Sequence, residues 1–200
     1  MPKEDIRSNK CVFVSHCILA QCIRANGLAK YYAGAVKPVV RFCLDHDINI
    51  MQMPCPESMC EAGGLGRDPH GKKWYEDRGL RQTAEKIARG QVIYMQELVK
   101  AGHEILAIIG MEFSPACAVT YLNKGPVIYK DEGIYVEELK KFMVQANLDI
   151  PFIGVNQRAH KKLDRQLNEM LRGTLGEYEK KEEEKKKKKK SNDGQLSLFD

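Results

Sequence analysis

The sequence predicts an α/β fold: a three-layer domain with a mostly parallel sheet of about four to five strands. Short apolar segments rich in β-branched residues alternate along the chain with longer segments of helical periodicity. This alternation is typical of strands joined by helices in a parallel sheet. The short segments are almost continuously apolar, as expected for strands that are covered on both faces.

Four strands are expected, at residues 11–15, 48–53, 105–110 and 151–155. Helices are expected from Pro38 onward and over residues 80–101, 134–147 and 157–171. Their inward faces are predicted from 3.6-residue periodicity. The predicted inward residues are Val39, Val40, Cys43 and Leu44; then Ala84, Ile87, Ala88, Met95, Leu98 and Val99; then Leu139, Phe142, Met143 and Ala146.

Length and composition suit one compact domain, because 200 residues with 43% hydrophobic content can build a core without disulfides. Seven cysteines cannot all pair within one chain. No apolar segment approaches the ~18 residues of a membrane span, and residues 1–10 lack the apolar core of a signal peptide. We therefore expect a cytoplasmic protein without membrane association, in which clustered cysteines bind metal or react.

The formal net charge of +5 lies mainly in the body of the chain, because the segment from residue 177 onward nearly balances lysines against acids. A mild positive charge is compatible with an anionic or nucleotide-like ligand, and is too weak to predict direct binding to duplex nucleic acid. Residues 1–176 are expected to form the domain. Residues 177–200 form a Glu/Lys tail, which is a solvated helix or disordered.

Three cysteines each follow a predicted strand: Cys17, Cys55 and Cys117. Because the carboxyl ends of parallel strands meet at one edge of a sheet, we expect the three thiols to lie together. Three thiolates and one open position suit a catalytic metal, or an iron–sulfur cluster with one iron free of protein ligands. Soft thiolates favour zinc, copper(I) or iron–sulfur centres. The alternative is three buried thiols without metal.

Two further cysteines, Cys22 and Cys60, lie within five residues of a predicted ligand. Either could be a fourth ligand, and a closed site would favour a structural or electron-transfer role over catalysis. Cys11 and Cys43 fall on apolar faces and are expected to be small buried hydrophobic residues.

Glu57 and Ser114 are the polar residues nearest to the predicted ligands. A carboxylate beside an open metal position can activate water, and a hydroxyl can orient it. Alternatively, Glu57 caps the next segment and Ser114 forms a turn before Pro115. The glycine-rich loop of residues 60–79 is predicted to be a lid or binding loop, or simply a solvated one. Its residues suited to grip a nucleobase or phosphate are Arg67, Lys72, Lys73, Trp74 and Tyr75.

Three motifs contain these residues. The first is Cys17-Ile-Leu-Ala-Gln-Cys22, followed by Arg24 and Asn26-Gly27. The second is Cys55-Pro-Glu57, and the third is Ser114-Pro-Ala-Cys117. In these motifs the chain resembles the TudS-like thiouracil desulfidase family, and it is most similar to a clostridial-type branch. The similarity covers roughly residues 10–156. Ala116 and Ala118 depart from the family's third motif, in which serine and glycine stand at these positions, so another thioamide-like compound is also open as substrate.

The resemblance implies a Rossmann-like fold and a bacterial hydrolase with a [4Fe-4S] cluster bound by Cys17, Cys55 and Cys117. Zinc is the alternative cofactor. The open iron would bind the sulfur of a thiolated pyrimidine, and water activated by Glu57 would convert thiouracil to uracil and sulfide. Ser114 would position substrate or water. We also expect substrate-binding residues, at Ser15, Arg24, Asn26 and Arg67.

Residues 195–199, Gln-Leu-Ser-Leu-Phe, resemble the short peptide by which bacterial proteins bind the sliding clamp of DNA replication. In such a peptide, Gln195 would hydrogen-bond at the mouth of the pocket, and Leu198 and Phe199 would fill it. The alternative is an unstructured end. Two other functions therefore remain open beside the desulfidase: a non-catalytic metal or electron-transfer module, and an accessory protein tethered to the clamp.

Overall fold

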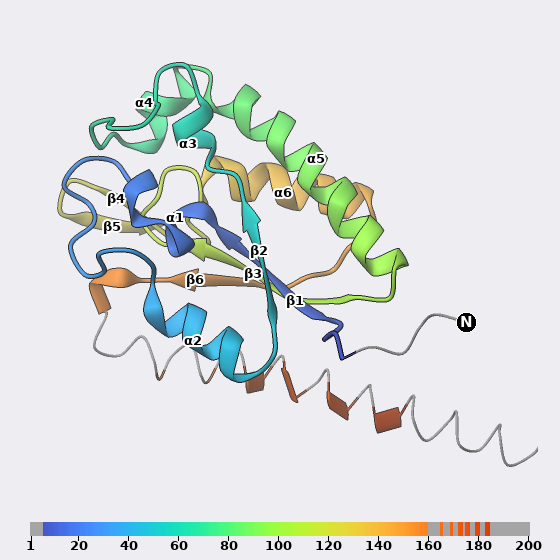
Figure 1. Cartoon of the computed structure of the whole chain (residues 1–200). Coiled ribbons are helices and arrows are strands. Elements are labelled where there is room, and N and C mark those ends of the chain that lie inside the picture. The colour runs from blue at the N-terminus through green and yellow to red at the C-terminus, as the bar shows by residue number, and fades with distance from the viewer. Residues whose placement is uncertain are drawn as a thin grey trace, which may run out of the picture.

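The structure, a computed structural model, describes residues 6–159 and some of the residues between 165 and 184. A parallel four-stranded sheet in the order β2-β1-β3-β6 forms its centre, and the strands run side by side across Figure 1. The strands are β1 (Lys10–Ser15), β2 (Asn49–Met53), β3 (Glu104–Met111) and β6 (Phe152–Val155). The register pairs Ser15 with Met53, so β1 and β2 end at the same level.

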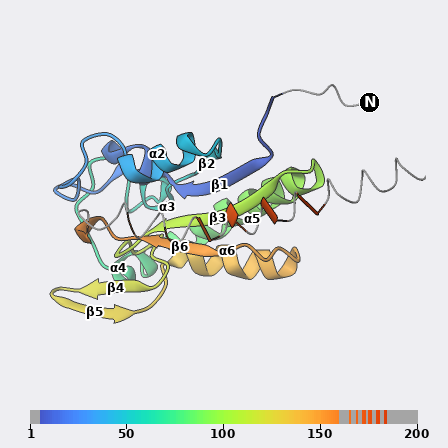
Figure 2. The ribbon, with the colours of Figure 1, turned by 90° about the horizontal axis from the view of Figure 1, so that it is seen from below.

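Helices cover both faces of the sheet, which makes the fold Rossmann-like with three layers. Figure 2 shows α2 on one side of the strands and α5 and α6 on the other. The covering helices are α2 (Lys37–Asp45), α5 (Leu80–Lys100) and α6 (Ile134–Gln145). The predicted α/β architecture is therefore confirmed, and each predicted strand lies within one residue of its expected start.

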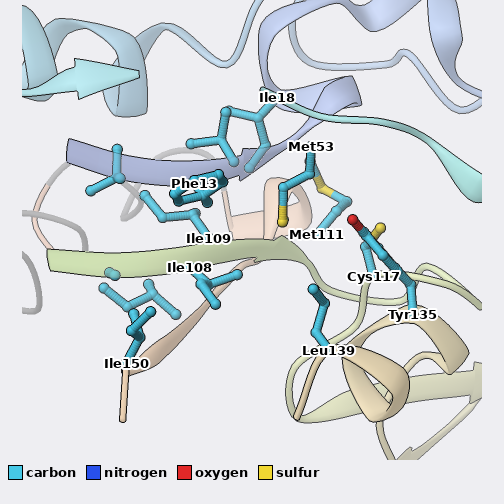
Figure 3. Close-up of a cluster of buried hydrophobic side chains, with 14 of the residues drawn as sticks. Phe13, Ile18, Met53, Ile108, Ile109, Met111, Cys117, Tyr135, Leu139 and Ile150 are labelled. Atoms are coloured by element: carbon cyan, nitrogen blue, oxygen red, sulfur yellow. The ribbon is translucent and has the colours of Figure 1, made fainter. Parts of the chain in front are cut away.

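The core lies between the two helical layers and is continuous through the sheet. Figure 3 shows its centre, where Phe13 and Ile109 from neighbouring strands pack beside Met53 and Met111. Val12, Phe13 and Val14 of β1 are all fully buried, as the continuous apolar segment predicts. The sheet thus gives a rigid base for the loops that follow its strands.

Short elements gather beyond the carboxyl ends of the strands, at one end of the sheet (Figure 1). They are α1 (His16–Leu19), the 3₁₀ turn η1 (Gln21–Ile23), α3 (Pro56–Met59), α4 (Lys72–Glu76), and the antiparallel hairpin of β4 (Tyr121–Lys124) and β5 (Val127–Lys130). The hairpin is not among the predicted strands, although Gly125-Pro126 separates two short segments of strand-forming residues. The α4 helix likewise interrupts the predicted loop of residues 60–79.

Several predicted inward positions are wrong. Leu44 is exposed, because α2 turns Phe42 rather than Leu44 toward the sheet. Val99 is exposed near the end of α5, beyond Val92 and Met95, which are the last buried residues of that helix. β2 was expected to be buried, but it is an edge strand in which only Met53 is fully buried.

The predictions for the C-terminal segment lie largely outside the described residues. Gln157–Ala159 form a 3₁₀ turn, η2, where the sequence predicts the start of a helix. Residues 185–200, with the predicted clamp-binding peptide, are outside the described part. Within the described residues, no helix is both long enough and apolar enough for a membrane crossing.

Candidate functional site

The three predicted ligands line one cavity at the carboxyl ends of the strands. Cys17 lies in α1 directly after β1, Cys55 precedes α3 after β2, and Cys117 lies in the loop after β3. All three belong to the wall of a cavity of about 880 Å³. Residues that are distant in sequence therefore meet because three neighbouring parallel strands end at the same edge.

Burial disfavours the ionised form of the three thiols; Cys55 and Cys117 are buried, and Cys17 is partly exposed. Burial raises the pKa of Cys17 to about 12 and raises the pKa of Cys117 well above its ordinary value. Burial also raises the pKa of Cys55, and so does the neighbouring Glu57 carboxylate. Negative charge on Cys55 would raise the pKa of both Cys17 and Cys117, and charge on Cys17 would raise that of Cys117, so the three thiols are electrostatically coupled. A bound cationic centre is what would keep all three as thiolates.

The cavity presents the donors of a metal site without a formed ligand group. Among the described residues, no group of three or more Cys, His, Asp or Glu side chains is arranged to hold a metal ion. Cys17, Cys55 and Cys117 nevertheless line the same cavity, and three soft donors are the type of ligand that zinc, copper(I) and iron–sulfur centres prefer.

A buried ion pair lies beside Cys55. Nη2 of Arg67 donates to Oε2 of Glu57 at 3.0 Å, and both side chains are at most one-tenth exposed. Nη1 of Arg67 donates to the carbonyls of Ile23 and Gly64 at 2.8 and 3.0 Å. Burial alone would lower the pKa of Arg67, but the Glu57 carboxylate outweighs it and raises that pKa. Arg67 therefore fixes the position of Glu57 and balances its charge.

Ser114 joins the Glu57 carboxylate to the Cys117 loop. Its hydroxyl donates to Oε1 of Glu57 at 2.8 Å. The hydroxyl oxygen of Ser114 also accepts the backbone N–H groups of Ala116 and Cys117, at 3.2 and 3.0 Å. The turn predicted for Ser114 is therefore present, and its hydroxyl also holds a carboxylate, whereas its role in positioning substrate or water stays a prediction. Glu57 itself lies in the first turn of α3.

Close backbone packing fixes the Cys117 loop. A Cβ on Gly110 of β3 would collide with the carbonyl oxygen of Cys117. A Cβ on Gly133, just before α6, would collide with the backbone of Ala116. Phe113, next to Ser114, has a φ of 64°, which a bulky side chain rarely adopts. Strained backbone of this kind clusters at functional sites, and here it turns the chain out of β3.

The other predicted site residues are distributed around the cavity. Ser15 and Arg24 line it, and Arg24 donates to the side chain of Gln157. Asn26 is exposed and donates to the carbonyl of Gly66, so it anchors the loop and is not part of the cavity wall. Cys22 is exposed, and the Cys60 thiol lies 3.5 Å from the carbonyl of Arg78. Neither of these two cysteines lines the cavity.

The predicted binding loop forms one rim of the cavity. Trp74 on α4 stacks against His70 with ring centroids 3.6 Å apart, and both line the cavity. Lys72 bonds to Asp131 and Glu137 at 3.0 and 2.6 Å, so its charge is already paired. Tyr75 is buried below the rim, and its burial raises its pKa to about 12.

Several residues near the site did not stand out in the sequence. Lys30, Lys124 and Arg158 add positive charge to the rim of the cavity, from segments without a recognisable motif. Glu112 is buried after β3 and accepts the backbone N–H groups of Thr120 and Tyr121. Tyr135, in the first turn of α6, has a buried hydroxyl without a hydrogen-bond partner among the described residues. The Gly133-Ile-Tyr135 helix start is the signal that could have indicated this residue.

Comparisons with known proteins give two similarities. The chain is 29% identical, over 169 residues, to an uncharacterised protein of Methanocaldococcus jannaschii; the match covers 84% of this chain and all of that protein. Among solved structures, the [4Fe-4S]-dependent thiouracil desulfidase TudS is similar with a TM-score of 0.48 and 20% identity. That match covers 80% of this chain and 95% of TudS. No family model matches the sequence.

Proposed function

We propose that the protein is an iron–sulfur-dependent desulfidase that hydrolytically removes sulfur from a thiolated pyrimidine-like compound. The observation that carries this proposal is the meeting of three thiols with the Glu57–Ser114 pair at one cavity. Cys17, Cys55 and Cys117 would hold a [4Fe-4S] cluster. When bound, the cluster supplies an open iron that binds the sulfur of the substrate and accepts it as it leaves.

Glu57 is the group that would take a proton from the attacking water. Its Oε2 is engaged by Arg67 and its Oε1 by Ser114, so the carboxylate is held in one orientation beside Cys55. In the net reaction, the oxygen of water bonds to the ring carbon and the carbon–sulfur bond breaks. Sulfur leaves as sulfide and the protons of water pass to sulfide and solvent. No oxidant or reductant is needed.

The cavity must hold both the cluster and the substrate, and it is large for a small-molecule site. Its volume of about 880 Å³ is near the upper end of the usual range for small-molecule sites. Lys30, Lys124 and Arg158 at the rim would favour a substrate that carries negative charge. We therefore expect a thiopyrimidine with an anionic substituent to be turned over with a lower KM than free thiouracil.

The deciding experiment is purification without oxygen, followed by quantification of iron, sulfide and turnover. The proposal predicts about four irons and four sulfides per chain, and sulfide release from a thiopyrimidine. Single Cys17→Ala, Cys55→Ala and Cys117→Ala variants should lose the cluster, whereas Cys22→Ala should keep it. Glu57→Gln should keep the cluster and lose about 10²–10⁴-fold in kcat. Full activity in Glu57→Gln, or wild-type protein free of iron after reconstitution, would overturn the proposal.

A non-catalytic metal or electron-transfer module is the competing function. It requires a fourth protein ligand, and Cys22 and Cys60 were the predicted donors. Neither lines the cavity, which is why we place it second. Zinc bound at full occupancy with unchanged behaviour in Glu57→Gln would favour this module.

A further inference from the structure

Two buried hydroxyls near Cys117 have no hydrogen-bond partner within the described part of the chain. They belong to Tyr135, which is fully buried at the start of α6, and to Ser15, which is 1% exposed at the end of β1. A hydroxyl buried without an acceptor is costly, and native structures seldom contain one without a reason. The Ser15 hydroxyl is close enough to the Cys117 sulfur to interact with it weakly. The Tyr135 hydroxyl has no acceptor among the described residues, which indicates that something else accepts its proton.

The position of Tyr135 shows where that acceptor would lie. Figure 3 shows its phenol oxygen beside the sulfur of Cys117, next to Met111 and above Leu139. Burial raises the pKa of the Tyr135 hydroxyl, and negative charge on Cys117 and Cys55 raises it further. The hydroxyl thus remains protonated and faces the side of the core where both cysteines lie. It can donate a hydrogen bond but has no acceptor of suitable geometry.

Ser15 approaches the same thiol from the sheet. Its hydroxyl lies close enough to Cys117 to oppose, weakly, the increase in that thiol's pKa caused by burial. It also lines the cavity, whereas the Tyr135 side chain lies behind the cavity wall. Cys117 is therefore flanked by donors from two different layers of the fold.

We propose that Tyr135 and Ser15 are positioning residues whose hydroxyls donate hydrogen bonds to sulfur atoms of the cluster or of its Cys117 ligand. This inference rests on the proposed function, since it needs a cluster at the three cysteines. Hydrogen bonds to cluster sulfurs stabilise the more negative, reduced state and so raise the reduction potential. They would also slow the loss of the cluster.

The test compares Tyr135→Phe and Ser15→Ala with Tyr94→Phe. Tyr94 is half-exposed on α5, and its ring packs edge-on against Phe13 away from the cysteines. In the cluster-loaded protein, Tyr135→Phe should give a more negative reduction potential and a cluster that is lost to a chelator about tenfold faster. Ser15→Ala should change both in the same direction, and Tyr94→Phe should change neither.

Thermal unfolding of the metal-free protein gives a second measurement, in which Tyr135→Phe should be stabilising rather than harmful. Without a cluster, the Tyr135 hydroxyl is buried and unpaired, so its removal should raise Tm by about 2–4 °C. A tyrosine that only packs the core would shift Tm in the same direction in both forms. If wild-type protein takes up no cluster, both the proposed function and this inference fail. If it does, and Tyr135→Phe leaves potential and cluster loss unchanged, only this inference is overturned.

Discussion

Ser114 and Glu57 lie 57 positions apart, and their side chains are joined by a hydrogen bond of 2.8 Å. The bond links the loop after β3 to the first turn of α3. Because Ser114 also accepts the backbone N–H group of Cys117, one hydroxyl connects a carboxylate with a predicted cluster ligand. A change at Ser114 should therefore affect the orientation of Glu57 and the shape of the ligand loop together.

Replacing Ser114 by alanine should lower kcat by about 10- to 100-fold. The lost bond is charge-assisted, and such bonds contribute about 1.5–3 kcal/mol. The measurement is steady-state turnover at known iron content. Ser58→Ala is the matched control, because the Ser58 hydroxyl bonds the Cys55 carbonyl at 2.9 Å and does not contact Glu57. If both variants lose activity only in proportion to lost iron, Ser114 acts on the loop alone.

The Arg67–Glu57 pair should contribute to stability in a way that exposed pairs do not. Arg67→Met leaves the Glu57 carboxylate buried without its counter-ion, which should cost about 3 kcal/mol, or about 6–12 °C in Tm. Arg89→Met is the control, because the Arg89–Glu85 pair is exposed and 3.8 Å long. We expect it to change Tm by no more than about 2 °C.

The double variant separates charge burial from lost packing at Arg67. Adding Glu57→Gln to Arg67→Met removes the uncompensated charge, so much of the lost stability should return. Thermal unfolding of the four proteins completes the cycle. If the two losses simply add, the pair is not coupled and the stabilising role of Arg67 comes from packing.

The sheet and the meeting of the three cysteines at one edge can be predicted from the sequence. The strands are recognised as local apolar segments, and the fold class then brings their carboxyl ends together. The expected β1, β2, β3 and β6 are apolar segments at regular spacing, and their carboxyl ends share one edge by topology. Contacts that depend on how a loop folds back over the domain cannot be predicted from such patterns. Arg67 meets Glu57 only because residues 60–71 return over α3, and no periodicity encodes that path.

Errors in the predicted core have a related cause. Periodicity does not settle which residues of α2 face the sheet, so Leu44 is wrongly predicted to point inward. It also does not show how far along α5 the burial extends, so Val99 is wrongly predicted to be inward as well. The β4–β5 hairpin was missed because its strands are only four residues each. Tyr135 was not distinguished from core residues, since its unpaired hydroxyl is visible only in three dimensions.

Two glycine-to-alanine substitutions should have opposite effects. In Gly133→Ala the new methyl group would collide with the Ala116 backbone and the amide nitrogen of Cys117, so the ligand loop must move. We expect a lower Tm and less iron per chain. In Gly90→Ala the methyl group meets no heavy atom within 4 Å on the exposed side of α5. This change should stabilise the helix by about 0.5–1 kcal/mol and leave iron content unchanged. Equal iron content in both variants would show that Gly133 does not set the Cys117 position.

The predicted clamp-binding peptide at residues 195–199 can be tested separately from the active site. Binding of the full chain to a bacterial sliding clamp, measured by fluorescence anisotropy, should be abolished by Phe199→Ala, because a few buried anchors supply most of the affinity of such peptides. Ser197→Ala is the control, since Ser197 is not one of the predicted anchors. Deletion of residues 195–200 should leave turnover of a free thiopyrimidine unchanged. Equal clamp binding by wild type and Phe199→Ala would mean that the match to a clamp-binding peptide arises by chance. This result would not bear on the proposal for the cysteine site, because the two predictions share no residue.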